Sequence, residues 1–277
     1  MQVIHTIADL RTARAGLTHV GFVPTMGFLH KGHISLVRRA RAECGAVAAS
    51  IFVNPTQFGP AEDLARYPRD LPRDLALLET AGADLVFTPE PAEIYPPGFD
   101  TQVLVGGITG VLEGAARPGH FAGVATVVAK LFNIVQPDVA YFGQKDAQQC
   151  AVIRKLVADL NLPVEIVVAP TVRDPDGLAL SSRNSYLTPA QRAAAPVLFQ
   201  ALTAARAAFD GGERDAGRLR EIMRRTIAAQ PEAQVDYLSL ADPQTLRELA
   251  RVEGQALASL AVRFGATRLI DNLLLGA

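Results

Sequence analysis

The sequence contains few cysteines and carries almost no excess charge of either sign. Cys44 and Cys150 are its only two cysteines, and they form neither a C-x-x-C pair nor the spacing of metal ligands. We therefore expect two buried thiols in a reducing, cytoplasmic setting. The formal net charge of −1 gives no general attraction to polyanions, which argues against a nucleic-acid partner.

Long apolar segments are missing as well. Residues 1–16 are interrupted by charged side chains, so we do not expect them to act as a secretory signal. No other apolar run approaches the length that is needed to cross a bilayer, so no membrane partner is expected. The 277 residues, 49% of them hydrophobic, are enough for a globular protein with two modest domains.

The strongest local signal is the segment PTMGFLHKGH, Pro24–His33. An apolar run at residues 20–23 precedes it, and a helical pattern starting at Ile34 follows it, so we expect a strand, a turn and a helix. Gly27 and Gly32 allow the backbone to turn and to approach a ligand closely. The N–H groups and the dipole of a helix start attract anions, so we expect an anion to bind there.

His30 and His33 fall in the first turn of this expected helix and add donors on one face. Two alternatives must be weighed: a zinc pair, or histidines that only cap the helix. The spacing H-x-x-H lacks the glutamate of H-E-x-x-H, which disfavours zinc. The order of strand, glycine turn and helix is typical of nucleotide sites in open α/β sheets and disfavours simple capping.

Further apolar runs without polar alternation indicate buried parallel strands at residues 46–53, 83–88, 139–142 and 164–169. Helical patterns between them occupy residues 72–82, 122–136 and 147–160, whereas the proline-rich residues 89–100 predict an irregular loop. We therefore predict an α/β fold, a Rossmann-like doubly wound parallel sheet over residues 1–171. A smaller α+β domain is expected over residues 172–277.

Within the second domain, Thr188, Pro189 and Gln191 supply a helix start with a capping box. We expect one helix from there to about residue 209 and another to about residue 229. Strands are expected at residues 235–240, 255–262 and 267–274, with a helical excursion at residues 243–249.

Polar residues follow two of the expected strands, at the sheet edge where ligands bind. Gln57 follows the strand at residues 46–53, and it is equally well explained as a ligand donor or as an amide that fixes its own loop. Lys145 follows the strand at residues 139–142 beside Gly143, and we favour a phosphate contact over a solvated surface lysine. Ser181, Ser182 and Arg183 offer three donors on a segment that we expect to be mobile and able to close over phosphates. A linker between two domains is the alternative, and the same segment can serve both roles.

Six blocks in this order resemble the pantothenate synthetase (pantoate–β-alanine ligase) family of the superfamily with the HIGH signature: PTMGFLHKGH, SIFVNPTQFG, YPRD, LEGAARPGHFAGV, YFGQKDAQQ and DGLALSSRN. The resemblance is dense from Val23 to about Leu187 and loose beyond. It implies a cytoplasmic homodimer that condenses (R)-pantoate with β-alanine through a pantoyl-adenylate. ATP is consumed with Mg²⁺, and AMP and pyrophosphate are released.

The resemblance also implies roles for individual residues, with His33 as the proton donor and no identified protein ligand for the metal. The implied catalytic set is His30, His33, Lys145, Ser181, Ser182 and Arg183. The implied ATP-binding set is Met26, Gly27, Phe28, Leu29, His30, Lys31, Gly32, His33, Gly143, Gln144, Lys145, Asp146, Val172, Leu180, Ser181, Ser182 and Arg183. Gln57 and Gln149 map onto the pantoate site, and Gln57 also onto the β-alanine site.

The family pattern is not matched everywhere, and two rival functions remain to be separated by experiment. Gln144, Ala147 and Leu180 replace the usual Glu, Tyr and Met, and Arg73 stands where an acid is common. One rival is a nucleotidyl transferase that acts on a phosphate ester, and the other is an inactive ATP-binding scaffold. An acyl-adenylate route needs no nucleophilic side chain, which fits the lack of a Ser-His-Asp or Cys-His arrangement.

Overall fold

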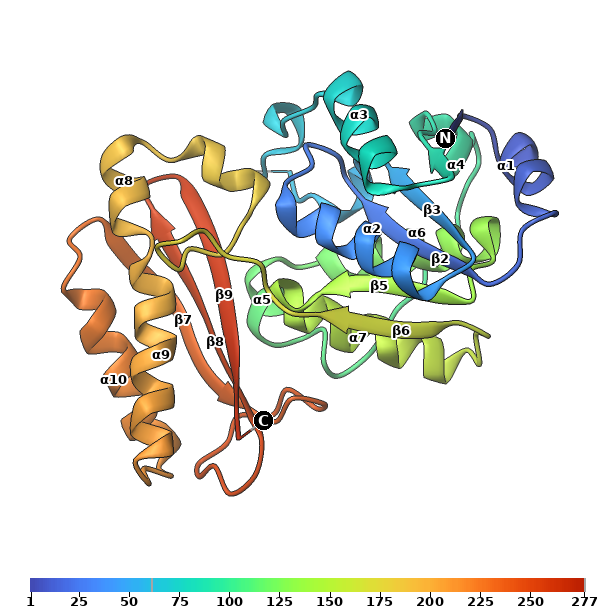
Figure 1. Cartoon of the computed structure of the whole chain (residues 1–277). Helices are drawn as coiled ribbons and strands as arrows, with labels where there is room; N and C mark the ends of the chain where they lie inside the picture. Colours follow the sequence, from blue (N-terminus) through green and yellow to red (C-terminus); the bar gives the residue numbers. More distant parts are fainter. Residues whose placement is uncertain (61, 277) are drawn as a thin grey trace. The chain divides into compact units, whose positions relative to one another are not determined.

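The computed structural model describes residues 1–60 and 62–276 (Figure 1). The chain forms two compact units, one of residues 1–143 and 152–170 and the other of residues 144–151 and 171–277. Each unit is built around one β-sheet. The expected boundary between domains at residues 171 and 172 stays a prediction, because a compact unit is not by itself shown to fold and function alone.

The sheet of the first unit is parallel throughout and has the strand order β1-β4-β3-β2-β5-β6. Its strands are β1 (Gln2–Ile4), β2 (Val20–Thr25), β3 (Ala46–Ile51), β4 (Leu85–Phe87), β5 (Val139–Gly143) and β6 (Glu165–Ala169). From β2 the chain continues through β3 to β4 on one side of β2, and then crosses to β5 and β6 on the other side. The point where the strand order reverses lies between the carboxyl ends of β2 and β5, which is where such sheets bind ligands.

Helices cover both faces of this sheet, as the handedness of parallel crossovers requires. The helices between the strands are α1 (Ile7–Arg14), α2 (Lys31–Glu43), α3 (Leu71–Ala81), α4 (Pro91–Ile94), α5 (Leu112–Ala116), α6 (His120–Val135) and α7 (Ala147–Asp159). Three 3₁₀ turns are η1 (Pro55–Gln57), η2 (Leu64–Arg66) and η3 (Gln144–Asp146). Because β2-α2-β3 and β5-α7-β6 progress in opposite directions, α2 and α7 cover opposite faces (Figure 1). The predicted doubly wound parallel sheet is confirmed.

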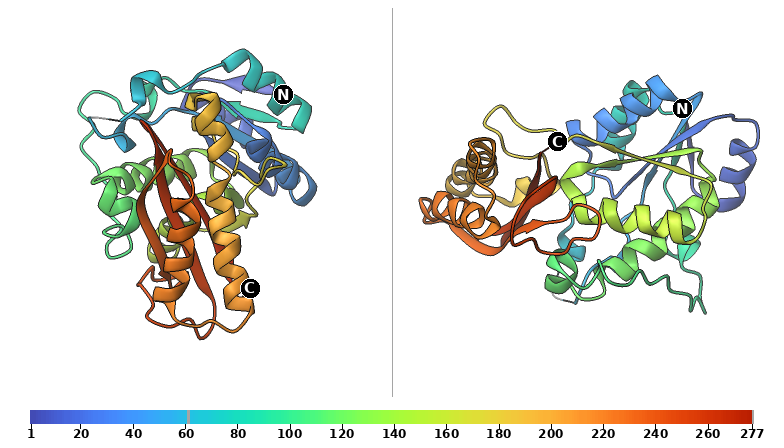
Figure 2. Two further views of the ribbon diagram at one scale, coloured as in Figure 1. Left: turned by 90° about the vertical axis from the view of Figure 1, so that its left-hand side faces the viewer. Right: turned by 90° about the horizontal axis from the view of Figure 1, so that it is seen from below.

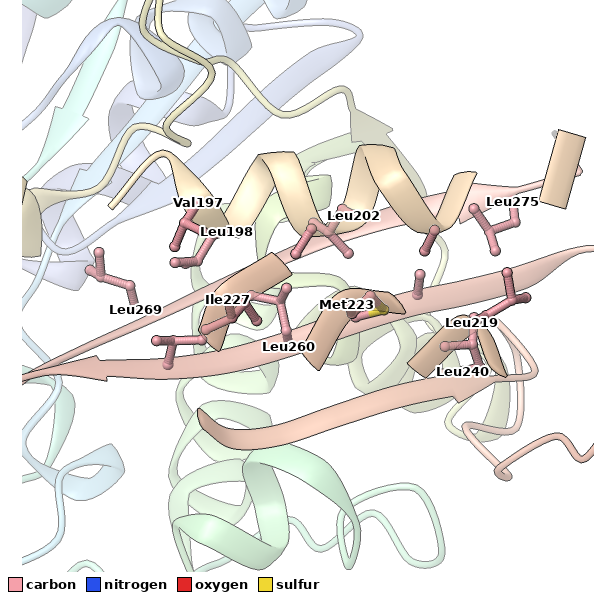
Figure 3. Packing of buried hydrophobic residues seen from close by; sticks show 14 of the residues in the cluster. Val197, Leu198, Leu202, Leu219, Met223, Ile227, Leu240, Leu260, Leu269 and Leu275 are labelled. Carbon is pink, nitrogen blue, oxygen red and sulfur yellow. The ribbon is translucent and has the colours of Figure 1, made fainter. Parts of the chain in front are cut away.

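The second unit has an antiparallel sheet with α9 and α10 packed against it (Figure 2). Its elements are η4 (Ser182–Tyr186), α8 (Pro189–Ala194), α9 (Val197–Asp210), α10 (Ala216–Ala228), β7 (Ala233–Ala241), β8 (Ala256–Phe264) and β9 (Thr267–Leu275). Leu202, Met223 and Leu260 are fully buried between the helices and the sheet (Figure 3). These apolar faces form a core of their own, which confirms the predicted α+β fold of this part.

Three predictions of secondary structure are wrong, each for a local reason. The single helix expected at residues 189–209 is divided into α8 and α9, because Pro196 has no N–H to donate. The loop at residues 89–100 includes the single-turn helix α4, which tolerates Pro91 because its first residue needs no donor. Residues 243–245 form a turn that the carboxylate of Asp242 caps by accepting the N–H groups of Gln244 and Thr245, and Leu246, with a φ of 56°, prevents its continuation as a helix.

Besides α4 and the 3₁₀ turns, three elements were not predicted from the sequence at all. They are β1, α1 and α5, which have only three, eight and five residues. In β1 only Ile4 is buried, and in α1 only Leu10, so neither segment shows an extended apolar pattern. Elements this short are stabilised by packing rather than by their own periodicity.

Within the described residues, 1–60 and 62–276, no helix is both long and apolar enough to span a membrane.

Candidate active site

The turn after β2 is held by a side chain from another helix. Gly27 and Phe28 both have positive φ angles, of 81° and 49°, so the backbone doubles back before α2. The two oxygens of the Asp74 carboxylate accept the N–H groups of Phe28 at 2.6 Å and of Leu29 at 2.7 Å. Leu29 is 1% exposed and packs in the core, so its side chain cannot reach a ligand. Asp74 therefore fixes the segment on which Met26 to His33 lie.

Asp74 was missed in the sequence, although a signal was present. It lies on α3 four residues before the buried Leu78, so a charged residue interrupts the apolar face of an amphipathic helix. Burial raises the pKa of its carboxyl, while the hydrogen bonds from Leu29 and Phe28 and the nearby Arg73 act in the opposite direction. A buried acid that accepts two backbone N–H groups is a structural anchor for the turn.

His30 and His33 cap the first turn of α2. The Nδ1 atom of His30 accepts the N–H of Gly32 at 3.2 Å, and Nδ1 of His33 accepts the N–H of His30 at 3.3 Å. The two rings lie 4.0 Å apart between centroids. Since Nδ1 accepts in both rings, the proton of each neutral imidazole is on Nε2. Capping and donation are thus compatible: the cap selects the tautomer that presents an Nε2–H donor.

Gln57 lies at the end of η1 and reaches the turn after β2. Its side chain is 8% exposed, its Oε1 accepts from Asn54 at 3.1 Å, and its Nε2 contacts Sδ of Met26 at 3.1 Å. Asn54 also donates to the carbonyl of Gly123 and accepts from the hydroxyl of Tyr95. The side chains that follow β2 and β3 are therefore in contact, as the sequence predicts for this edge of the sheet.

The backbone of η1 rests directly on α6. A Cβ at Gly123 would lie 2.4 Å from the carbonyl oxygen of Thr56, so only glycine permits this approach. His120 lies three residues earlier on α6, and its Nδ1 is 2.9 Å from the carbonyl oxygen of Gln57. Because that carbonyl can only accept, Nδ1 carries the proton.

His120 is held in this neutral tautomer by its surroundings. Arg117 lies 3.1 Å from Nε2 of His120 and forms an ion pair of 2.6 Å with Glu62. Burial, aided by the positive charge of Arg117, lowers the pKa of His120 to about 4. The sequence block RPGHF was recognised, but neither residue was assigned a role in holding Gln57.

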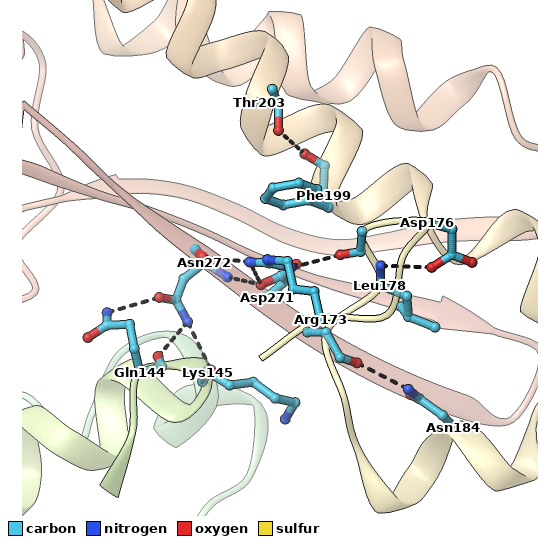
Figure 4. Close-up of polar contacts among 12 residues, drawn as sticks. Gln144, Lys145, Arg173, Asp176, Leu178, Asn184, Phe199, Thr203, Asp271 and Asn272 are labelled. Atoms are coloured by element: carbon cyan, nitrogen blue, oxygen red, sulfur yellow. Dashed lines mark hydrogen bonds and ion pairs between the residues drawn. The ribbon is translucent and has the colours of Figure 1, made fainter. Parts of the chain in front are cut away.

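The segment after β5 is held in a different way. Asn272 on β9 donates from Nδ2 to the carbonyl oxygens of Gln144 at 3.0 Å and Lys145 at 2.8 Å (Figure 4). Its Oδ1 accepts from Nε2 of Gln144 at 3.0 Å. Nζ of Lys145 is 3.4 Å from Asp146, and the lysine side chain is 19% exposed. Gln149 lies half-buried in the first turn of α7.

The loop with the three expected phosphate donors belongs to the same unit as Lys145. The N–H of Leu180 donates to the carbonyl of Val172 at 3.0 Å, which closes the chain between them into a hairpin-like loop. Ser181 caps η4 by accepting the N–H of Arg183, and Ser182 is 8% exposed. The loop therefore has a hydrogen-bonded closure and a helix cap of its own.

The predicted site residues thus fall into two groups. Met26 to His33, Gln57 and Gly143 belong to the first unit, whereas Gln144 to Asp146, Gln149, Val172 and Leu180 to Arg183 belong to the second. Among residues 1–60 and 62–276, no cluster of three or more His, Cys, Asp or Glu side chains could hold a metal ion. Both Asp74 oxygens already accept backbone N–H groups, so the described part of the chain offers no prepared carboxylate cage for Mg²⁺.

Fold and turn together define an α/β protein with a glycine turn and a histidine-capped helix start at the reversal point of a parallel sheet. Comparison with known proteins identifies the family. The sequence model described as "Pantoate-beta-alanine ligase" matches residues 2–274. A curated pantothenate synthetase from Chloroflexus aggregans is 65% identical, over 99% of this chain and 100% of the relative.

Solved structures agree with this assignment. Pantothenate synthetase from Thermus thermophilus has a TM-score of 0.94 and 53% identity, with 99% of each chain covered. The pantoate-β-alanine ligase from Francisella tularensis, complexed with β,γ-ATP and β-alanine, has a TM-score of 0.82 and 36% identity, with 99% and 97% covered. The chain belongs to the pantoate–β-alanine ligase family. It is a ligase that condenses pantoate with β-alanine at the expense of ATP and forms pantothenate.

Proposed function

We propose that the two groups of site residues bind one molecule of MgATP and activate the pantoate carboxylate on it. A carboxylate does not accept an amine, because oxide or hydroxide would have to leave. Attack of that carboxylate on the α-phosphorus of ATP forms the pantoyl-adenylate and expels pyrophosphate. The observation that carries the proposal is the turn between β2 and α2, which lies at the reversal point of the sheet and bears two oriented imidazole donors.

Negative charge grows on the phosphate oxygens during this step, and the proposed donors oppose it. His33 donates its Nε2 proton to the developing oxyanion, and His30 donates beside it. Lys145, Ser181, Ser182 and Arg183 contact the phosphates from the second unit. Fixed donors of this kind stabilise a transition state by about 3–4 kcal/mol each, because they need no reorganisation when the charge appears.

The remaining residues of the predicted ATP site act mainly through the backbone. The chain from Met26 to Lys31 lines the turn, Gly143 to Asp146 form the second contact, and Val172 and Leu180 flank the adenine side. The ion that accompanies ATP is held by phosphates and water, since Mg²⁺ retains several waters and accepts few protein ligands.

Gln57 and Gln149 bind pantoate in this proposal, and Gln57 also binds β-alanine. The Nε2 group of Gln57 faces a thioether, which is a weak acceptor, so a hydroxyl or carboxylate oxygen of the substrate would be a better partner. Both side chains are neutral and therefore grip oxygens without a salt bridge that would weaken the nucleophile. In the second step the amine of β-alanine attacks the acyl carbon and AMP leaves.

The wider organisation is also proposed rather than observed. Residues 1–171 serve as the nucleotide- and pantoate-binding domain, and residues 172–277 act as a lid domain. The protein works as a homodimer in the cytoplasm. Two free, buried cysteines support a reducing compartment.

The test is to incubate the protein with MgATP and (R)-pantoate, with and without β-alanine, and to analyse the products by mass spectrometry. We expect pantoyl-adenylate and pyrophosphate without the amine, and equal amounts of pantothenate, AMP and pyrophosphate with it. A transferase for phosphate esters would form no acyl-adenylate, and an inactive scaffold would leave ATP intact. Either result would contradict the proposal.

The pantoate site is tested separately with Gln57→Ala. We expect the KM for pantoate to rise at least tenfold, because several hydrogen bonds to polar substrate groups are lost. Gln102→Ala, which removes an exposed amide of the same unit, is the matched control and should behave like the wild type. Unchanged pantoate kinetics in Gln57→Ala would exclude this role.

A further inference from the structure

The middle of β9 contacts two other chain segments at once. Asp271 and Asn272 are neighbours on this strand and are only 2% and 4% exposed, although both are polar. Successive side chains of a strand point in opposite directions, so the two residues serve different partners. Asp271 accepts a bidentate pair from Arg173 at 2.6 and 2.9 Å, whereas Asn272 contacts η3 (Figure 4). Neither residue was singled out in the sequence.

The orientation of the Asn272 amide follows from its partners. Two of them are backbone carbonyl oxygens, of Gln144 and Lys145, and a carbonyl oxygen can only accept. The amide nitrogen must therefore face them, and Oδ1 must face the side chain of Gln144. All three bonds go to the tripeptide η3, so one buried side chain fixes the backbone that carries Lys145.

Asp271 in turn keeps Asn272 in place. Its Oδ1 accepts the backbone N–H of Asn272 at 2.8 Å. Arg173, which holds Asp271, also stacks on the ring of Phe199 at 3.9 Å and donates to the carbonyl of Gly177 at 3.1 Å. The middle of β9 is thus braced from the side opposite to η3, and it cannot shift without disrupting a buried ion pair.

Within the part of the chain that the structure describes, Lys145 has no tight side-chain partner that would direct it. Its Nζ lies 3.4 Å from Asp146, a long contact for a charged pair, and the side chain has four rotatable bonds. The position of Nζ is therefore set mainly by the backbone of η3. We propose that Asn272 is a positioning residue for the ligase reaction, which holds the backbone of Lys145 so that its ammonium group meets the phosphates. This inference rests on the proposed role of Lys145.

The first test compares Asn272→Ala with Gln234→Ala, which removes an exposed amide from β7 of the same sheet. We expect kcat of Asn272→Ala to fall about 10- to 100-fold, since a catalytic group displaced by about 1 Å loses that much rate. The KM for β-alanine should stay within about threefold, while the control keeps wild-type kinetics. Thermal unfolding of each variant confirms that the assays compare folded proteins.

An isosteric variant separates positioning from packing. Asn272→Asp keeps the size and shape of the side chain but turns oxygens toward the two carbonyls. If Asn272 only filled space, this variant would retain its rate. We expect at least the loss seen for Asn272→Ala in protein that is folded by circular dichroism. Wild-type kcat in Asn272→Asp would overturn the inference.

The decisive test is a double-mutant cycle with Lys145→Ala. If Asn272 acts through Lys145, Asn272→Ala should change kcat by less than about threefold once the lysine is absent, because coupled residues are not additive. The same fold loss in both backgrounds would overturn the inference. If Lys145→Ala alone leaves kcat unchanged, the proposed phosphate contact fails as well. If Lys145→Ala loses rate but Asn272→Ala does not, only the positioning role fails.

Discussion

The turn that follows β2 is held through its backbone N–H groups, whereas the segment that follows β5 is held through its backbone carbonyl groups. In the first case Asp74 accepts from Phe28 and Leu29. In the second case Asn272 donates to Gln144 and Lys145. Each segment is short and bears an expected phosphate donor. In each, the side chain that fixes the geometry comes from a different part of the sequence.

The comparison shows that the type of side chain that holds each segment depends on which backbone groups the segment leaves without an intrahelical partner. A turn before a helix exposes N–H groups, for which a carboxylate is the best acceptor. A 3₁₀ turn that leaves a strand exposes carbonyls, which need a donor such as an amide. Burying the carboxylate of Asp74 costs more desolvation free energy than burying the amide of Asn272. We therefore expect the loss of Asp74 and the loss of Asn272 to differ in size.

The largest effect is expected where a donor itself is removed. His33→Ala should lower kcat about 100- to 1000-fold, because a fixed donor to the developing oxyanion is lost. Arg38→Ala, which removes an exposed cation from the same helix, is the control and should retain wild-type kcat. Steady-state release of pyrophosphate measures both. A loss below about threefold in His33→Ala would remove this residue from the mechanism.

The next largest effect is expected in the pH dependence of stability, because His120, which contacts the carbonyl of Gln57, is neutral in the folded protein. The pKa of His120 is lowered to about 4 in the folded protein, so between pH 6.5 and 4 the unfolded chain binds a proton that the folded chain does not. The free energy of unfolding should therefore fall with decreasing pH in this range, by about 3 kcal/mol in total from this group. The contribution is fully present above pH 6.5 and lost below about pH 4.

Urea unfolding of His120→Asn at several pH values isolates this contribution. The variant should lose the corresponding part of the pH dependence, whereas His19→Asn, a change at an exposed histidine, should retain it. Parallel pH curves for His120→Asn and the wild type would show that His120 is not held neutral by the fold.

Removing the anchor of the first turn should have a somewhat smaller effect on stability. Asp74→Ala leaves the N–H groups of Phe28 and Leu29 without their acceptor, and we expect a loss of about 2–3 kcal/mol in the free energy of unfolding. The rate kcat should fall about 10- to 100-fold, because His30 and His33 follow the displaced turn.

A matched carboxylate on the same helix is the control. Asp70 caps α3 by accepting the N–H of Arg73, so Asp70→Ala should cost about 1 kcal/mol and leave kcat unchanged. If both variants lost activity to the same extent, α3 as a whole, and not the Asp74 anchor, would support the turn.

The smallest effect is expected for the hydrogen bond between the side chains of Gln144 and Asn272. Gln144→Met keeps the length of the side chain but removes its donation to Oδ1 of Asn272. The two backbone bonds remain, so we expect a loss of about 1 kcal/mol in unfolding free energy and kcat within about threefold of the wild type. A rate loss as large as that of Asn272→Ala would place the side chain of Gln144, rather than the backbone of Lys145, at the centre of the contact.

The sequence predicted the parallel sheet and its ligand edge because those features are local. Apolar runs marked β2, β3 and β5, and the polar residues behind them marked the edge at which Met26 and Gln57 meet. The helix cap of Thr188 and Gln191 was predicted for the same reason and is confirmed.

The holding residues could not be predicted because their partners are distant in sequence. Asp74 and Asn272 show only that a polar residue lies on an otherwise apolar face, and that signal does not say which backbone group is bound. His120 was part of a recognised block, yet its neutral tautomer depends on Arg117 and on burial, which only the folded chain brings together. The break at Pro196 was visible and was overlooked.

The most direct test of the account is a crystal structure with a non-hydrolysable ATP analogue. We predict that Nε2 of His33 and Nζ of Lys145 both lie about 3 Å from phosphate oxygens of the same analogue. Asp74 and Asn272 should keep their backbone contacts. An analogue that is bound by only one of the two segments, with the other donor turned away, would contradict the central claim.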